Sequence, residues 1–290
     1  MKSIIKRGGD FILYGNIWIA LCAWLQCIQS ISILHLGGQA SMIPSFVFWS
    51  TLFVYNLHRI IAAIYSDLYP ERGIRISLSK ALNIRRFRTT LLVLLFLSVL
   101  ICCDDYFSPE FHVRRELILA AAISLAYALP IFKGKRLRDF PYVKIFFIAF
   151  VWTYVTVILP NLQAGKPIES NVIVLGIARL LFIFAITIPF DIRDLEIDRS
   201  MGVRTIPTAL GAECARRIAL YALGASFACS YFLYFHSAYS IGRLAALGIS
   251  LIFAGIMVQF SNEKRGDYYY GYVVDGMMLL QGLLVLMVNG

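Results

Sequence analysis

Apolar residues run through this chain in long blocks that are separated by shorter, charged segments. Residues 11–58 contain no charged side chain, and a stretch of this length suffices for about two crossings of a bilayer. Charges, glycines and prolines divide the sequence into nine blocks, most of them near the roughly 20 residues that a spanning helix needs. The predicted helices are Phe11–Leu36, Ile43–Tyr65, Thr89–Cys103, Leu117–Phe132, Tyr142–Leu159, Val172–Phe190, Ile218–His236, Ile241–Phe260 and Tyr268–Val288. The pattern predicts an all-α polytopic membrane protein, a single domain over residues 1–290.

Composition supports this fold class and excludes others. Of the 290 residues, 59% are apolar and 15% charged, whereas soluble domains are nearer a quarter charged. The net charge of +10 is typical of proteins that bind nucleic acid, but those proteins do not carry such long apolar runs. We therefore expect membrane lipids as the surrounding partner and no nucleic acid.

The distribution of basic residues among the loops predicts the orientation of the helices. With the N-terminus inside, 21 of the 27 Lys and Arg residues fall in inner segments. The four in outer loops are Arg114, Arg115, Lys166 and Arg243. Because basic residues concentrate in cytoplasmic loops, the split predicts nine helices with the N-terminus in the cytoplasm and the C-terminus outside. We expect an integral protein of the bacterial inner membrane.

Three aspartates directly after the sixth predicted helix carry the clearest chemistry. Asp191, Asp194 and Asp198 are spaced i, i+3 and i+7, so they lie along one face if the helix continues. Acids this close repel one another unless positive charge sits among them. Magnesium is commonly held by one or two carboxylates plus phosphate oxygens. The spacing therefore favours a Mg²⁺ site for a phosphorylated substrate, the alternative being a solvated helix of mixed charge.

The same segment resembles a known family. Asp191-x-x-Asp194-x-x-x-Asp198-Arg199-x-x-Gly202-x-x-Thr205-x-Pro207 is similar to the second aspartate-rich motif of the UbiA superfamily of intramembrane prenyltransferases. Tyr127-Ala-Leu-Pro130, followed by Lys135-Arg136, resembles that family's Tyr…Pro…Lys-Arg stretch. The resemblance implies nine transmembrane helices and transfer of a polyprenyl group to a small aromatic or quinone-precursor acceptor. It implies Mg²⁺ as cofactor, an active site facing the cytoplasm, and Asp191, Asp194 and Asp198 as catalytic metal ligands.

The first motif of the family is degenerate in this chain. The family pattern N-D-x-x-D-x-x-x-D corresponds here to Asn56 followed by Leu57, Ile60 and Ile64 at the acid positions. Asp67 and Glu71 follow downstream and could substitute for these acids only if the helix were repositioned. Arg59 shares a helix face with Asn56, and a guanidinium binds phosphate directly in bidentate fashion. We therefore expect Asn56 and Arg59 to contact the prenyl diphosphate, the alternative for Arg59 being an anchor at the helix end.

Other basic side chains complete the predicted substrate site. Lys144 and Arg179 lie within predicted helices, and a cation inside a membrane is a functional candidate. Lys144 is near enough to a helix end to reach the interface, so Arg179 is the stronger candidate. The predicted substrate-binding residues are Asn56, Arg59, Tyr127, Lys135, Arg136, Arg179 and Arg199.

Two other functions remain open. The missing acids of the first motif are compatible with a family member that has lost catalysis or changed reaction and binds lipid. A secondary transporter is the other alternative, although transporters place ionisable residues near the midplane on broken helices. The acids of this chain instead cluster at one predicted membrane edge.

Overall fold

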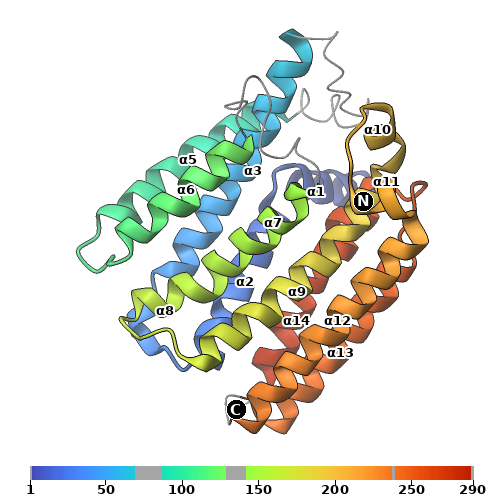
Figure 1. Ribbon diagram of the computed structural model, residues 1–290. Helices are drawn as coiled ribbons and strands as arrows, with labels where there is room; N and C mark the ends of the chain where they lie inside the picture. Colours follow the sequence, from blue (N-terminus) through green and yellow to red (C-terminus); the bar gives the residue numbers. More distant parts are fainter. Residues whose placement is uncertain (1, 69–86, 129–141, 237–238, 289–290) are drawn as a thin grey trace.

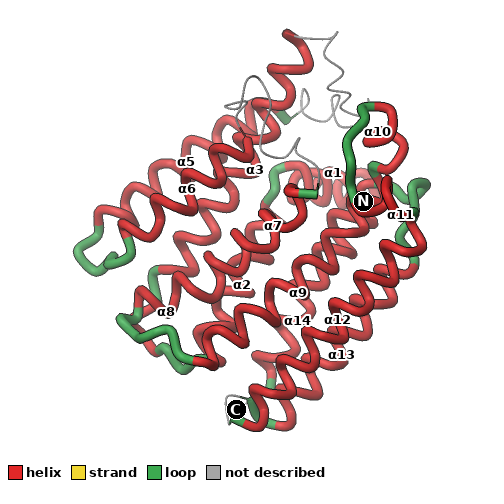
Figure 2. Tube along the Cα trace, in the orientation of Figure 1, coloured by secondary structure: helices red, strands yellow, loops and turns green. Residues whose placement is uncertain are grey.

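A computed structural model describes residues 2–68, 87–128, 142–236 and 239–288 of the chain. Within these ranges every regular element is helical and none is a strand (Figure 2). The elements are α1 (Lys2–Tyr14), α2 (Ile17–Ile33), η1 (Gly37–Ala40), α3 (Ile43–Leu68), α5 (Arg88–Phe107), α6 (Arg114–Ala128), α7 (Val143–Thr153), η4 (Tyr154–Ile158), α8 (Leu159–Gln163), α9 (Ser170–Arg193), α10 (Leu195–Ser200), α11 (Ile206–Leu210), α12 (Ala212–Phe235), α13 (Ile241–Gln259), η5 (Tyr269–Val274) and α14 (Asp275–Met287). The long helices run side by side as a bundle (Figure 1).

Six of the described helical segments are long and apolar enough to cross a membrane, or seven if one bent pair counts as a single span. The six are Arg88–Phe107, Val143–Gln163, Ser170–Arg193, Ala212–Phe235, Ile241–Gln259 and Tyr269–Met287. They overlap the third and the fifth to ninth predicted blocks. Helix α6 has 15 residues, or about 22 Å at 1.5 Å per residue, less than the hydrocarbon thickness. The all-helical membrane fold is confirmed, and the count of nine crossings stays a prediction.

The first predicted block is not one helix. It bends by 64° between α1 and α2, and Asn16 at the bend has a positive φ of 61°. Asn56 of α3 stabilises this elbow, since its side-chain oxygen accepts a hydrogen bond from the Asn16 amide at 2.7 Å and its own amide donates to the Gly15 carbonyl at 3.3 Å. The prediction of a straight helix was wrong because long-range side-chain partners satisfy the polar groups freed at the bend.

Helix α9 forms the centre of the bundle. It is the most buried of the six candidate spans, since 72% of its 18-residue apolar stretch is buried. It packs against α7 and α12. Helix α2 in turn packs between α3 and α14. Pro189 lies inside α9 without ending it, and the helix continues to Arg193. The central helix thus delivers the aspartate motif to one end of the bundle.

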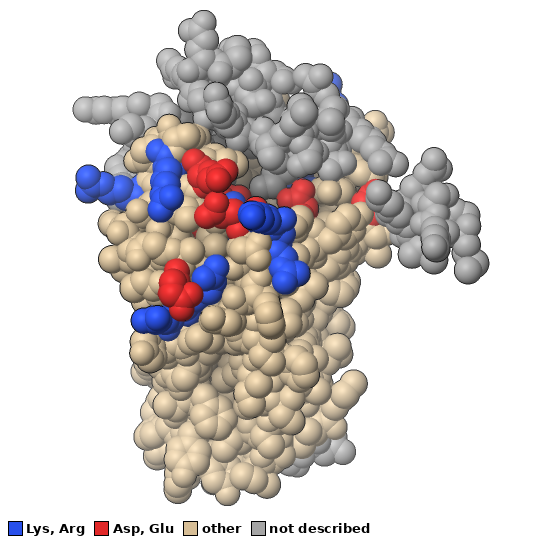
Figure 3. Space-filling view, turned by 90° about the vertical axis from the view of Figure 1, so that its right-hand side faces the viewer, with Lys and Arg blue, Asp and Glu red and all other residues tan. Residues whose placement is uncertain are grey.

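Charge is concentrated at that same end. Helices α1, α10 and α11 lie there in Figure 1, whereas α14 ends at the opposite end. On the face shown in Figure 3 the charged side chains lie toward the α10 end, and the remainder of the surface is largely uncharged. A long uncharged surface below a charged end is the arrangement that a bilayer requires.

Candidate functional site

The aspartate motif lies on a broken helix, not on a continuous one. Helix α9 ends at Arg193, Asp194 adopts φ −90° and ψ 8°, and α10 begins at Leu195. The backbone amide of Asp198 donates to the Asp194 carbonyl at 2.8 Å. Asp194 and Asp198 therefore share a face at the start of α10, while Asp191 stays on α9. The condition for one face shared by all three acids, a helix that continues through them, is not met, because the chain turns at Asp194.

The remaining motif residues turn the chain back toward the bundle. Gly202 has a φ of +66°, a conformation that costs other residues about 1–2 kcal/mol. Thr205 caps α11 through a reciprocal capping box with Thr208, whose hydroxyl accepts from the Thr205 amide at 2.7 Å. Pro207 lies in the first turn of α11, where its missing N–H is tolerated. These residues fix the segment that follows the acids.

Asp191 forms an ion pair with Lys144 from the first turn of α7. The Lys144 Nζ and Asp191 Oδ1 atoms lie 2.6 Å apart. The Lys144 side chain is 19% exposed and the Asp191 side chain 3% exposed. The backbone amide of Tyr142 donates to the Arg204 carbonyl at 3.1 Å, which holds the start of α7 beside the segment after α10. Lys144 therefore reaches the aspartate motif, although its position near a helix end had ranked it below Arg179 in the sequence.

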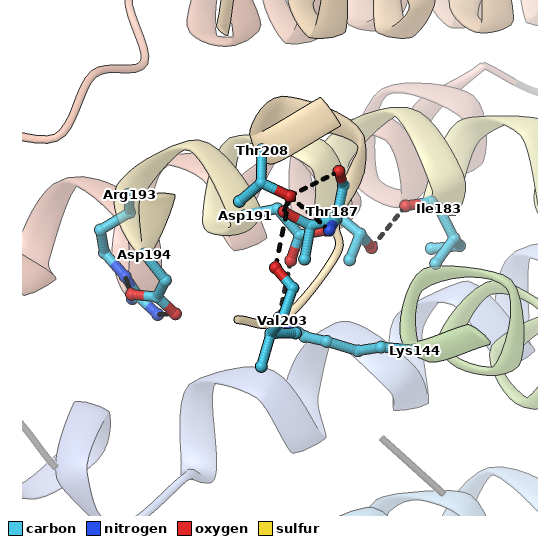
Figure 4. Close-up of polar contacts among 9 residues, drawn as sticks. Lys144, Ile183, Thr187, Asp191, Arg193, Asp194, Val203 and Thr208 are labelled. Atoms are coloured by element: carbon cyan, nitrogen blue, oxygen red, sulfur yellow. Dashed lines mark hydrogen bonds and ion pairs between the residues drawn. The ribbon is translucent and has the colours of Figure 1, made fainter. Parts of the chain in front are cut away.

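Asp194 binds its neighbour Arg193 in bidentate fashion, with N–O distances of 2.8 and 2.9 Å. The Arg193 guanidinium also lies 5.2 Å from the ring centroids of both Phe190 and Tyr270, within the range of cation–π attraction. In Figure 4 this pair lies to one side of Asp191 and Lys144. Two of the three acids thus have cationic partners, which reduces the repulsion between them.

The predicted first-motif residues reach the elbow next to this site. Asn56 is fully buried against Gly15 and Asn16, and the Arg59 guanidinium donates to the Tyr14 carbonyl at the end of α1. Asp267 acts electrostatically on both Arg59 and Arg193, so Arg59 faces the same end of the bundle as the aspartate motif. Asn56 and Arg59 lie on one face of α3. Their hydrogen bonds stabilise the elbow between α1 and α2.

Helix α1 is held at this end by the start of the last span. The Asp10 carboxylate accepts a hydrogen bond from the Tyr268 hydroxyl. This bond raises the pKa of the Tyr268 phenol, since losing its proton would place two negative charges together. Tyr268 is therefore a neutral donor that fixes α1 across the α10 end of the bundle.

Other predicted residues lie elsewhere. Arg179 is 3% exposed and donates to the Gln26 carbonyl, the Gln29 side chain at 2.7 Å and the Ser30 hydroxyl. It precedes Asp191 by twelve residues on α9, or about 18 Å, so it is not brought together with the acids. Arg199 is exposed on α10. Tyr127 lies in α6 with its side chain outside the described part, and Lys135 and Arg136 lie outside the described residues.

A family model agrees with the motif and the fold. The model of the UbiA prenyltransferase family matches residues 72–274, which is more than half of the chain. The chain belongs to the UbiA prenyltransferase family. Its members are membrane proteins, in agreement with the six apolar spans. No curated protein sequence matches the chain.

Solved structures of UbiA homologues share the fold. One from Aeropyrum pernix K1, in the apo state, has 15% identity and a TM-score of 0.62, covering 93% of this chain and 99% of its own. One from Archaeoglobus fulgidus, bound to GPP and Mg²⁺, has 12% identity and a TM-score of 0.62, covering 96% and 100%. A digeranylgeranylglyceryl phosphate synthase structure has 17% identity and a TM-score of 0.57, covering 97% and 98%.

The described residues of this UbiA member fit a magnesium ion that phosphate oxygens help to hold. Among the described residues no three His, Cys, Asp or Glu side chains gather closely enough to hold a metal by themselves. Magnesium needs only one or two carboxylates when phosphate oxygens complete its shell. Asp194 and Asp198, four residues apart on one face of α10, supply that number. Helix α3 has Leu57, Ile60 and Ile64 where a second acidic set would stand.

Two acids near the site were missed in the sequence. Asp267 precedes η5 and acts on Arg59 and Arg193, and Asp275 begins α14. Asp275 could have been found, since it is the one acid in the ninth predicted block, Tyr268–Val288. Asp267 carries no such signal, because an acid in a polar loop is ordinary.

Proposed function

We propose that this UbiA member is a Mg²⁺-dependent intramembrane prenyltransferase, which moves a polyprenyl group from a prenyl diphosphate to a small aromatic or quinone-precursor acceptor. The observation that carries the proposal is the α9–α10 junction, where Asp191 and Asp194 pair with the cations Lys144 and Arg193 at one end of an apolar bundle. Such charge beside a membrane span is expensive unless it serves a function. Family membership supports the same reaction class.

Each residue of the junction has a role in this proposal. Asp194 and Asp198 would hold the magnesium ion, which when bound neutralises the negative charge that grows on the departing diphosphate. Lys144 and Arg193 place fixed positive charge beside Asp191 and Asp194, so they bind the diphosphate before and after the C–O bond breaks. Asp191 orients Lys144 through the 2.6 Å ion pair. Arg59 adds a third cation from α3.

The prenyl chain then lies among the helices below the junction. Phe190 and Tyr270, which flank Arg193 at 5.2 Å, place aromatic rings beside the proposed diphosphate position. Their faces stabilise positive charge on the allylic carbon as the diphosphate departs. Burial of the chain by apolar helices also keeps water from that carbon.

The proposal includes an orientation in the membrane. The excess of basic residues in alternate loops supports a cytoplasmic N-terminus, an external C-terminus and a site facing the cytoplasm. A bacterial inner membrane is the proposed location. Matches that extend over 93–97% of the chain support a single domain.

The decisive experiment measures binding and turnover of geranyl diphosphate by purified protein, with Mg²⁺ or with EDTA. We expect EDTA, Asp194→Ala and Asp198→Ala each to abolish turnover and to weaken binding by about 10–100-fold, the range found even for outer partners of metal ligands. Glu196→Ala is the matched control, because Glu196 lies between these acids but is exposed. Equal activity in all variants would refute the assignment.

A second candidate is a UbiA member that binds prenyl lipids without transferring them. The observation that favours it is the apolar set Leu57, Ile60 and Ile64 on α3, in place of one acidic motif. Geranyl diphosphate binding that depends on Asp194, with neither diphosphate release nor product in native membranes, would establish this candidate over the enzyme.

A further inference from the structure

A carboxylate lies inside the bundle without a role in the site described above. Asp275 begins α14 directly after the π-helical segment η5. Its neighbour Val274 is 1% exposed and Gly276 is buried, but Asp275 itself is partly exposed. Within the described part of the chain its carboxylate has no hydrogen bond or ion pair, and its bonds are made by the backbone, whose carbonyl accepts from the Cys22 thiol at 3.3 Å. An acid in a membrane span marks function by default.

Asp275 lies deeper in the bundle than the aspartate motif, below the end of the bundle that carries the motif. The Tyr270 ring is 5.2 Å from the Arg193 guanidinium, so Tyr270 marks the level of the motif. Asp275 follows five residues later, after the end of η5, and therefore lies further into the bundle. Arg193 is also the charged side chain that acts electrostatically on Asp275. The carboxylate therefore lies below the proposed diphosphate site, near the level of the reacting carbon.

A donor without a partner lies on α2, over the residue that follows Asp275 in the chain. The indole nitrogen Nε1 of Trp18, on α2, is buried and has no hydrogen-bond partner. The Trp18 ring covers Gly276, where a Cβ atom would lie 3.5 Å from Cζ2 and 3.8 Å from Nε1. A buried N–H without a partner costs free energy, and a carboxylate within a membrane span is stabilised by a hydrogen-bond donor. One hydroxyl that donates to Asp275 and accepts from Trp18 would satisfy both.

We infer that Asp275 and Trp18 form the acceptor subsite, and that the acceptor is a neutral alcohol or phenol whose hydroxyl donates to the Asp275 carboxylate. This inference rests on the proposed prenyl transfer. The prenyl C1–O bond breaks and its electron pair leaves with diphosphate, while an electron pair of the acceptor forms the new bond to C1. The acceptor loses one proton, which Asp275 takes up and later releases to water.

The charge of the subsite selects the class of acceptor. A carboxylate-bearing acceptor at this position would place two negative charges together in a low-dielectric interior, where their repulsion is strong. Arg193 is already bound in bidentate fashion to Asp194, so it offsets only part of that cost. A neutral hydroxyl adds no charge and supplies the proton that the carboxylate accepts.

Two measurements test the inference. The first uses membranes of a deletion strain complemented with each variant, because native membranes contain the acceptor. Radiolabelled geranyl diphosphate is added, and prenylated product is separated from geraniol, which forms when water captures the prenyl group. The second is geranyl diphosphate binding to purified protein. Asp105→Asn is the matched control: Asp105 is an aspartate of α5 that binds Ser45, far from the aspartate motif.

For Asp275→Asn we expect geranyl diphosphate binding within twofold of the wild type. We expect at least a 100-fold loss of prenylated product, since general bases contribute about 10²–10⁴-fold, and a larger share of geraniol. Asp275→Glu restores part of the transfer, and Trp18→Phe lowers it by about 2–10-fold, as for one neutral hydrogen bond. A fold defect would not change the partition between product and geraniol.

Other outcomes overturn the inference. If Asp275→Asn forms product within threefold of the wild type, Asp275 is not the general base. If that variant loses geranyl diphosphate binding, Asp275 belongs to the diphosphate site or stabilises the fold. For the acceptor class, 4-hydroxybenzyl alcohol should inhibit transfer at about tenfold lower concentration than 4-hydroxybenzoate, and stronger inhibition by the benzoate refutes a neutral acceptor. If the wild type forms neither product nor geraniol, the proposed function itself fails.

Discussion

Replacing Lys144 by methionine should destabilise the protein through the charge that it leaves behind. Methionine keeps an unbranched apolar stem of similar length, so the packing of α7 changes little. Asp191 then loses its partner at 2.6 Å, and its side chain is only 3% exposed. A lone carboxylate in such a position has lost its hydration, and no cation then offsets the free energy of that desolvation.

The magnitude follows from the exposure of the two side chains. Removing one partner of a fully buried pair costs about 3–5 kcal/mol. Lys144 is 19% exposed, so water already screens part of the pair, and we expect about 2–3 kcal/mol for Lys144→Met. Asp191→Asn should cost about 1 kcal/mol, because Lys144 can extend its amine toward the interface. The double variant should lose about 1–2 kcal/mol, less than the sum of the single changes.

Unfolding in detergent micelles, followed by tryptophan fluorescence for all three variants, measures this coupling. Lys166→Met is the control, since Lys166 is an exposed lysine whose amine binds the His35 carbonyl, and it should change stability by less than about 0.5 kcal/mol. Strictly additive losses for Lys144→Met and Asp191→Asn would refute the reasoning, because they would mean that the pair contributes nothing as a pair.

Two further predictions concern the backbone around the site. Gly202→Ala should cost about 1–2 kcal/mol because Gly202 has a φ of +66°, whereas Gly224→Ala, in the middle of α12 with open space around its Cβ, should be neutral or stabilising; equal thermal midpoints would contradict this. Asn56→Ala should cost about 1–3 kcal/mol, since it leaves the Asn16 side-chain amide and the Gly15 carbonyl without these partners. Ser98→Ala is the control, because the Ser98 hydroxyl binds a carbonyl of its own helix. A thermal shift for Asn56→Ala no larger than that of the control would disprove a stabilising role for the elbow.

The helices and the aspartate motif could be predicted because their signals are local. The ninth block, Tyr268–Val288, differs from the final helical segment Tyr269–Met287 by one residue at each end. Apolar length and bounding charges determine such a segment without reference to the rest of the chain. The same holds for Asp191, Asp194 and Asp198, which are adjacent in sequence and whose identity as a motif does not depend on packing.

The other features depend on contacts between distant parts of the chain. Lys144 meets Asp191 across 47 residues, and no pattern within α7 distinguishes a lysine that reaches the interface from one that binds an acid. The bend at Asn16 depends on Asn56, 40 residues away. The turn at Asp194 also has no adjacent proline or glycine from which it could be predicted. Each of these features required the packing of the helices.

The balance of charge explains how a UbiA member can lack one acidic motif. In the described part of the site Asp191 pairs with Lys144 and Asp194 pairs with Arg193, so these four side chains sum to zero before any ligand binds. A diphosphate then adds negative charge, which one magnesium ion offsets in part and the fixed cations offset further. The family's first acidic set would lie at Leu57, Ile60 and Ile64 of α3, where Asn56 and Arg59 instead hold the elbow. Loss of those acids and a lysine beside Asp191 therefore belong to one consistent electrostatic arrangement.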